Sequence, residues 1–349
     1  MNPIAVVIVN YNTRHHLRAC LSTVLSEAPS EVIVVDNASS DGSVEMVRDD
    51  YPSVLVQANQ RNVGYGAASN QGIASCKAAY VFLLNADTRL QPGALRALSS
   101  YLDLHPRAAI VGPRLVELDG SLQASCYPFP TPLHTFLENS SCAVILGRLV
   151  RRYVPAVRRL YLRTWPHNAA RTVPWLKGAA LFVRRNAFEA VGGFDKSFFL
   201  YFEDADLCYR LKAVGWEVHF APVTTVMHAG GASTLQYRGD MAVQLLASTI
   251  HFYRRHCSTF RLAEMVVIVK SLMLANWICA LFQLKLTRDP GKRSEIAQDI
   301  SASHKVAFGR WPWHEWRVSS SGTAAPLTVS SPASETTYAL PRSHDRSTD

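Results

Sequence analysis

Three carboxylates lie within four consecutive positions of this 349-residue chain, at Glu203, Asp204 and Asp206, and apolar or aromatic residues flank them on both sides. Asp206 can pair with Arg210 at the surface of a helix, because the two are four positions apart. Free N–H groups at a helix start would stabilise one more carboxylate. These structural roles do not explain why two acids, Glu203 and Asp204, are adjacent. A carboxylate walled by aromatic residues at the end of a rigid element suits a general base that takes a proton from a hydroxyl.

Two more acids stand where predicted strands end. Asp36 ends the run EVIVVD, and Asp87 follows the run YVFLLN. In open α/β sheets, ligands bind beyond the carboxyl ends of the strands. Asp36 could accept a hydrogen bond from a nucleobase imide or a ribose hydroxyl, and Asp87 could hold Mg²⁺ or Mn²⁺. The alternative for each acid is a turn or helix-cap residue without a ligand. His228 follows another apolar run and is a candidate second metal ligand, although a lone histidine there is more often structural.

These residues are positioned by short apolar runs that alternate with helical spacing. We expect strands at residues 4–9, 31–36, 54–58, 80–85 and 108–112. Helical spacing separates them at residues 14–27, after Asp41, at 65–76 and at 92–105. This alternation predicts an α/β fold with a doubly wound, mostly parallel, Rossmann-like sheet. A further strand is expected at 178–185 and a helix after Asp204.

The composition predicts a folded enzyme-sized domain rather than a disordered chain. Hydrophobic residues make up 48% of the sequence and charged residues 18%. The seven cysteines form no CxxC pair and are odd in number, so we expect reduced thiols in the cytoplasm. The first apolar run is too short for a secretory signal.

The positive charge is concentrated in one window. The net charge is +9, and residues 139–188 hold ten basic residues and no acid. Such a window attracts phosphate, nucleic acid or anionic lipid, or else forms a solvated face. It carries no recognisable nucleic-acid motif, so no nucleic-acid partner is expected.

A long apolar segment lies near the C-terminus, at residues 262–286, and Lys270 is the single charge between 265 and 284. The segment is long enough to span a bilayer. Its polar positions do not gather on one helical face, which disfavours a simple amphipathic helix. A helix buried against protein, a monotopic insertion and a single span all stay open. The Ser-, Thr- and Pro-rich residues 319–349 are expected to be a disordered tail.

Six segments together resemble glycosyltransferase family 2, an inverting family with the GT-A fold, and in particular its bacterial rhamnosyltransferase-like members. The resemblance covers residues 3–255 and rests on VVIVNYN (6–12), VVDNASSDGS (34–43), NVGYGAASNQG (62–72), LLNADT (83–88), GGFDKSFFLYFEDADLCYRL (192–211) and MHAGGAS (227–233). It implies a catalytic domain over residues 1–240, with a nucleotide-sugar half at 1–120 and an acceptor and catalytic-base half at 121–240. A helical region, possibly membrane-associated, would follow at 241–318.

The resemblance also implies a role for each matching residue on the donor side. Asp36 and Tyr11 would contact the nucleobase, and Asn62 and Gly64 would lie near the nucleotide. The family has a D-x-D motif where this chain has Asn85, Ala86 and Asp87. Mg²⁺ or Mn²⁺ would then be held by Asp87, His228 and the donor diphosphate, with Asn85 supplying hydrogen bonds but no charge.

On the acceptor side, Asp204 would be the catalytic base and Glu203 its neighbour. The implied reaction is one inverting displacement from dTDP-L-rhamnose, or from a UDP-hexose, to a hydroxyl of a lipid-linked or polysaccharide acceptor of the cell envelope. A processive Q-x-x-R-W motif is absent at its nearest match, where Ala307 replaces glutamine, so one sugar per encounter is expected. The enzyme would be cytoplasmic, peripheral to or anchored on the inner face of the plasma membrane, with its oligomeric state open. A catalytically silent GT-A scaffold is the rival hypothesis.

Overall fold

The computed structural model describes residues 2–132, 135, 165–230 and 238–309. Most of the basic window (139–164) and the tail predicted at 319–349 lie outside the described residues. The six cysteines that the structure describes are free thiols, as expected from their number and spacing.

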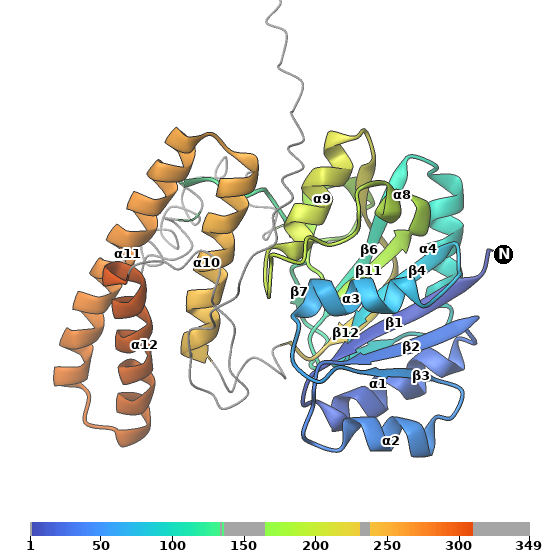
Figure 1. The fold of residues 1–349 in the computed structure, drawn as a ribbon, viewed down its shortest axis with the longest axis horizontal. Helices are drawn as coiled ribbons and strands as arrows, with labels where there is room; N and C mark the ends of the chain where they lie inside the picture. Colours follow the sequence, from blue (N-terminus) through green and yellow to red (C-terminus); the bar gives the residue numbers. More distant parts are fainter. Residues whose placement is uncertain (1, 133–134, 136–164, 231–237, 310–349) are drawn as a thin grey trace, which may run out of the picture.

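A mixed sheet forms the centre of the molecule (Figure 1). Its strand order is β3 (Leu55–Ala58), β2 (Glu31–Asp36), β1 (Ile4–Asn10), β4 (Tyr80–Asn85), β11 (Ala180–Arg184), β6 (Ala108–Val116), β12 (Glu217–His228) and β5 (Thr88–Leu90). The first four strands are parallel, and β12 is parallel to β6. β11 runs antiparallel to both of its neighbours. The predicted doubly wound, largely parallel sheet is therefore confirmed, with one antiparallel strand inserted at its middle.

Helices cover both faces of this sheet, which explains why its strands read as continuous apolar runs. On one face, α1 (Arg14–Ser26), α2 (Ser43–Asp50) and α4 (Ala94–Leu104) pack against side chains such as Ile8 and Phe82. On the other face, α3 (Tyr65–Ala74), α8 (Arg185–Ala190) and α9 (Glu203–Ala213) pack against side chains such as Val7 and Leu83.

The register of the parallel strands determines which polar residues meet at one edge. Asn10 is paired with Asp36, and Val9 with Asn85, so the carboxyl ends of β2, β1 and β4 lie side by side. The remaining described strands are two residues long: β7 (Leu122–Gln123) pairs with β6, β9 (Arg171–Thr172) pairs with β12, and β8 (Cys126–Tyr127) pairs with β10 (Trp175–Leu176).

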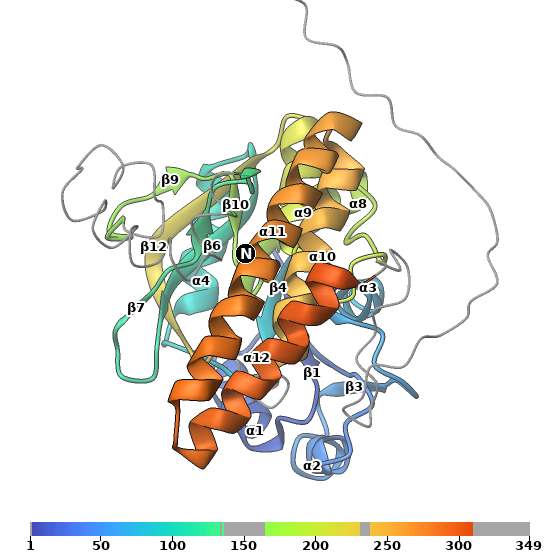
Figure 2. The same cartoon turned by 90° about the vertical axis from the view of Figure 1, so that its left-hand side faces the viewer.

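Three helices, α10 (Arg238–His256), α11 (Thr259–Leu286) and α12 (Pro290–Phe308), stand together beside the sheet domain (Figures 1 and 2). α10 is the one next to the sheet domain, and its buried residues share a core with Phe198 and Ala205 at the start of α9. Ser248 of α10 also donates a hydrogen bond to the Leu200 carbonyl, at 2.8 Å. The helical unit is thus packed directly against the segment that carries the acidic cluster.

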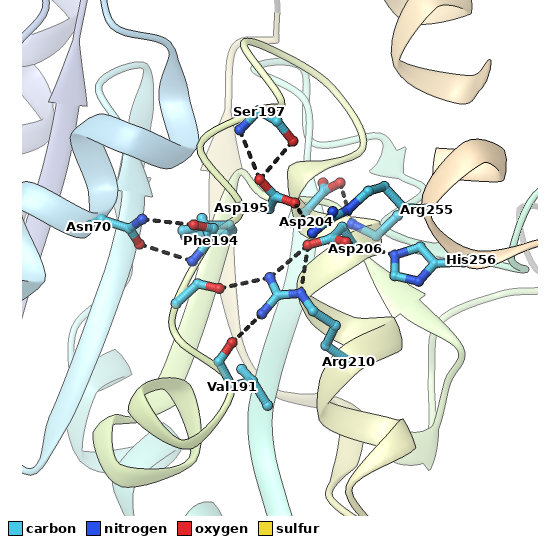
Figure 3. A network of polar contacts seen from close by, with 12 residues as sticks. Asn70, Val191, Phe194, Asp195, Ser197, Asp204, Asp206, Arg210, Arg255 and His256 are labelled. Atoms are coloured by element: carbon cyan, nitrogen blue, oxygen red, sulfur yellow. Dashed lines mark hydrogen bonds and ion pairs between the residues drawn. The ribbon is translucent and has the colours of Figure 1, made fainter. Parts of the chain in front are cut away.

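A buried ionic network joins these two parts (Figure 3). Asp206 is 1% exposed. Its two oxygens lie 2.6 Å from Arg210 Nη2 and 2.7 Å from His256 Nε2. Arg210 also donates to the carbonyls of Val191 and Gly193. The expected Asp206–Arg210 pair is present, but its expected place at the surface was wrong, because α10 lies across this side of α9 and covers the carboxylate.

Replacing Asp206 by alanine should lower the free energy of unfolding by about 3 kcal/mol, the lower end of the range for a buried ion pair, because the partly buried Arg210 and His256 would lose their shared ionic partner. The control is Asp50→Ala, which removes the partner of Arg18 from a pair whose side chains are 48% and 40% exposed. That exposed pair should contribute at most about 1 kcal/mol. Urea unfolding followed by circular dichroism measures both; equal losses would contradict the structural role given to the buried network.

Candidate active site

A cavity of about 520 Å³ opens at the carboxyl ends of β1 and β4, opposite the start of α9. Eight of the residues selected from the sequence line it: Tyr11, Asn62, Gly64, Asn85, Asp87, Glu203, Asp204 and His228. Residues that are up to 217 positions apart in the sequence therefore line one cavity. Its size suits a small-molecule ligand.

Asp36 is the one selected residue that is not in this lining. It is 1% exposed, and its oxygens accept hydrogen bonds from Asn10 Nδ2 at 2.7 Å and from the Ser39 N–H at 2.8 Å. Its neighbour Asn37 lines the cavity instead. An ionised carboxylate has lone pairs to accept more than two hydrogen bonds. Its expected contact with a nucleobase stays a prediction.

The loop around Gly64 forms part of the cavity wall. Asn62 Oδ1 accepts from the Gly64 N–H at 2.9 Å, and Asn37 Nδ2 donates to the Gly64 carbonyl at 3.3 Å. Gly64 has φ +87°, and a Cβ atom there would collide with the Phe199 carbonyl oxygen. Only glycine both adopts this conformation readily and allows the approach to residue 199. The loop is thereby held against the segment that leads into α9.

Asp204 is a buried carboxylate with two backbone donors. The Gly178 N–H donates to its Oδ2 at 2.7 Å and the Ala205 N–H donates to its Oδ1 at 2.8 Å. Burial raises the pKa of Asp204 to about 6, and these hydrogen bonds, with the charge of Lys177, limit the rise. A carboxylate with this pKa is ionised at neutral pH yet basic enough to accept a proton from a positioned hydroxyl.

Glu203 lies beside Asp204 in a different environment. It is 5% exposed, and its Oε2 has no hydrogen-bond partner within the protein. Burial, followed by the neighbouring charge of Asp204, raises the pKa of Glu203 well above its usual range. The two environments push the two pKa values apart, and of the two acids Glu203 is the one whose protonated form is favoured more.

Backbone strain accompanies the start of α9. Tyr201 and Phe202 both have left-handed conformations, with φ of 66° and 67°. Such values are rare for bulky residues and persist where the surroundings impose them, most often at functional sites. This turn places Glu203 and Asp204 in the first turn of α9, so the helix predicted after Asp204 begins slightly earlier than expected.

A candidate metal site lies across the cavity. His228 Nε2 is 3.3 Å from Asp87 Oδ1 and 3.2 Å from Asn85 Nδ2. Its Nδ1 lies 2.6 Å from Gln123 Oε1, an oxygen that only accepts, so Nδ1 carries the proton of the neutral ring. In that tautomer the lone pair of Nε2 would face Asp87 and Asn85, which is the form in which imidazole binds a metal.

These donors fit a divalent cation that is shared with a ligand. Within the described ranges, no group of three or more His, Cys, Asp or Glu side chains could hold a metal alone. Mg²⁺ usually takes one or two carboxylates and completes its shell with water and phosphate oxygens. Asp87 matches that pattern as the single carboxylate, and His228 adds a nitrogen donor, with the neutral Asn85 beside them.

Sequence reasoning missed the residues that support this histidine. Gln123 Nε2 donates to Glu117 at 2.6 Å, and Lys177 Nζ donates to Gln123 Oε1 at 3.2 Å. Glu117, Gln123 and Lys177 all line the cavity. Gln123 stands on a two-residue strand, too short for any periodic signal. Tyr65, whose hydroxyl donates to the Gly178 carbonyl at 2.8 Å, was within a quoted motif but was not selected.

Comparison with known proteins places this arrangement in a family. The family model for glycosyltransferase like family 2 matches residues 2–267. A Mycobacterium tuberculosis N-acetylglucosaminyl-diphospho-decaprenol L-rhamnosyltransferase is 30% identical over 299 residues, which cover 81% of this chain and 94% of that protein. A Shigella flexneri dTDP-rhamnosyl transferase is 25% identical over 68% of this chain and 72% of that protein.

Solved structures agree with the fold. A mannosyltransferase from Pyrobaculum calidifontis, crystallised with GDP-Man and Mn²⁺, has a TM-score of 0.50 at 15% identity and covers 89% of this chain and 88% of that one. GalNAc-T7, crystallised with UDP, GalNAc and Mn²⁺, has a TM-score of 0.50 at 16% identity, over 73% of this chain and 51% of that one. Both support the GT-A-type fold expected from the sequence. With its motifs joined in one cavity, the chain belongs to glycosyltransferase family 2 and is a glycosyltransferase with bacterial rhamnosyltransferases among its relatives.

Proposed function

We propose that this protein is an inverting, metal-dependent rhamnosyltransferase that moves one L-rhamnose from dTDP-L-rhamnose to a hydroxyl of a polyprenyl-diphosphate-linked glycan. The observation that carries the reaction type is the pairing, in one cavity, of an ionisable base at Asp204 with the Asp87–His228 pair. The proposed donor and acceptor are those of the Mycobacterium and Shigella relatives, as their names describe them.

The mechanism is a single displacement that begins with a proton transfer. Asp204 takes the proton of the acceptor hydroxyl, whose oxygen forms a bond to the anomeric carbon of the donor. The bond from that carbon to the nucleotide diphosphate breaks on the opposite side, so the configuration inverts. The raised pKa of Glu203 favours its protonated form, which would keep a second negative charge away from the base.

The leaving group is accommodated at the other end of the cavity. Asp87 and His228 would hold a divalent cation that neutralises charge on the departing diphosphate. Gln123 fixes the orientation of the His228 ring, and Asn85 adds an amide that can donate to phosphate or ribose oxygens. Tyr11, Asn62 and Gly64 line the cavity and would form its nucleotide side, where Asp36 would accept the imide hydrogen of the nucleobase.

Two alternatives remain candidates. A UDP-hexose donor would use the same residues, because thymine and uracil present the same imide hydrogen. A catalytically silent scaffold would have no need of an ionised, hydrogen-bonded Asp204 in a cavity, and Asp87, His228 and Asp204 are all retained. The proposed enzyme is cytoplasmic and acts at the inner face of the plasma membrane, where a lipid-linked acceptor is embedded.

The proposal is tested by incubating the purified chain and Mn²⁺ with dTDP-L-rhamnose and a synthetic polyprenyl-diphosphate N-acetylglucosamine, and analysing the products by mass spectrometry. We expect one added deoxyhexose per acceptor. Transfer from UDP-glucose, but not from dTDP-L-rhamnose, would support the first alternative. Absence of product from every donor would support the scaffold.

In the same assay, Asp204→Asn should lower kcat by about a hundredfold or more, which is the scale of general-base catalysis, while dTDP binding stays normal. Glu203→Gln is the matched comparison, because glutamine imitates a protonated carboxyl and should cost less than tenfold. Equal losses in the two variants would contradict the assignment of the base.

The rate should depend on pH through Asp204. Burial raises its pKa to about 6, and the base is active only when ionised. We therefore expect kcat/KM to fall about tenfold per pH unit below pH 6 and to level off above it. Stopped assays between pH 4.5 and 8 with saturating Mn²⁺ measure this. A flat profile across pH 6 would show that Asp204 does not act as the base.

Metal binding should depend on both cavity ligands and on Gln123. Asp87→Asn should abolish the enhancement of dTDP binding by Mn²⁺ in calorimetry, because the amide removes the ionic ligand. Gln123→Ala should weaken Mn²⁺ binding by about 10–100-fold, the usual effect of losing a partner that orients a histidine ligand. Asp119→Asn, in an exposed turn, is the control. Unchanged Mn²⁺ dependence in Asp87→Asn would exclude the site.

A further inference from the structure

The outer face of α11 is apolar and exposed. Of the described helices, α11 is the one long and apolar enough to cross a membrane by length and composition, yet 28% of its most apolar window is buried in the protein. Six large apolar side chains on it are between 39% and 82% exposed: Phe260, Val267, Leu274, Ile278, Phe282 and Leu286. Exposed apolar side chains gathered in this way mark a surface that is covered by something else.

These side chains form one stripe, which Glu264, Ser271 and Lys285 interrupt. At 100° per residue, the six positions fall within an arc of about 120°. The opposite side of the helix carries the buried residues Met265, Val269, Leu272, Met273 and Ala280. Packing against α10 and α12 therefore explains why the inner side of the helix is apolar as well.

A transmembrane span does not fit the helical packing. α12 lies along α11, and the small cavity between them brings Asp299 and Ser303 close to Asn276 and Gln283. A span by α11 would draw these groups and the charged α12 into hydrocarbon, at a cost of about 2.5–3.5 kcal/mol for each charge near the bilayer centre. A helix lying parallel to the membrane leaves α12 on its protein side.

The charge around the stripe identifies the surface it would meet. Residues 254–293 contain eight basic and two acidic residues. The basic residues gather at both ends of α11, with Arg254, Arg255 and Arg261 before or within its first turn and Lys285, Arg288, Lys292 and Arg293 at or beyond its last. A second copy of this helix would bring basic ends together in either direction. Anionic headgroups would neutralise both ends at once.

We propose that α11 lies in the plane of an anionic phospholipid membrane, with its exposed stripe inserted among the lipids and its basic ends at the headgroups. This inference rests on the proposed function in one respect: membrane binding would bring the active site to a lipid-linked acceptor. Membrane binding itself follows from the stripe and the charges, and it needs neither donor nor acceptor.

Co-sedimentation of the full chain with phosphatidylglycerol–phosphatidylcholine vesicles tests the proposal. The wild type should bind, and each of Val267→Asp, Ile278→Asp and Phe282→Asp should weaken binding about tenfold, because each removes an inserted apolar group and adds a repelled charge. Leu104→Asp is the matched control, since Leu104 is a 78% exposed leucine on α4, away from the stripe. It should bind as the wild type does.

The outcomes separate the possible occupants. Absence of wild-type binding to anionic vesicles, or equal binding by all the variants, overturns the proposal. A dimer in solution that Val267→Asp dissociates, without vesicle binding, assigns the stripe to a second copy instead. Thermal unfolding of each variant distinguishes lost binding from misfolding. Transfer to a water-soluble acceptor analogue would persist if membrane binding failed, so the two proposals fail separately.

Depth measurements distinguish a helix in the plane from a span. Spin labels are placed singly at 260, 274 and 286, in a chain whose Cys142, Cys257 and Cys279 are replaced by serine. A helix in the membrane plane gives three similar depths. A span separates neighbouring labels by about 20 Å, with 274 the deepest, and that result would overturn the proposal.

Discussion

The active site depends on keeping Asp204 ionised inside a buried wall. Burial opposes its charge, and the hydrogen bonds from the N–H groups of Gly178 and Ala205 are what stabilise it. The carbonyl of Gly178 in turn accepts the hydroxyl of Tyr65, which comes from the nucleotide half of the domain. Residue 178 is therefore held from both sides of the cavity, and the position of the base relative to the donor depends on these few hydrogen bonds. A shift of the loop before β11 would therefore disturb both hydrogen bonds of Gly178, the one to Asp204 and the one from Tyr65.

The antiparallel strand β11 explains how that loop arrives there. Because β11 lies between β4 and β6 and runs against both, its N-terminal end meets the carboxyl end of β4. The Asn85 N–H donates to the Ala179 carbonyl at 3.0 Å, which joins the metal side of the cavity to the loop of the base. Strand ends that are fixed by register thus supply the residues proposed here for the cation, for the support of the base and for the nucleotide. Catalytic residues placed in this way need little adjustment when substrates bind.

The sequence predicted what depends on local pattern. The apolar runs indicated β1, β2 and β4, and their terminal polar residues pointed to Asp36 and Asp87. The aromatic surroundings of Glu203 and Asp204 distinguished that pair from ordinary helix caps. Contacts between distant segments could not be predicted: Asp206 is buried because His256 arrives from 50 positions later, and Gln123 meets His228 across 105 positions. Neither Gln123 nor Lys177 stands in a periodic segment, so no sequence signal marked them.

The helical unit gives the membrane proposal a mechanical consequence. α10 contributes Met241 to the cavity lining, and its last residue, His256, contacts Asp206 in the helix of the base. α11 follows after two residues and shares a buried core with α10. A membrane that holds the outer stripe of α11 would therefore also fix the orientation of α9, through packed side chains and a buried ionic network rather than a loose linker. A flexible tether would only raise the local concentration of enzyme near its acceptor, whereas this rigid connection would also hold the base at a constant height above the lipid headgroups.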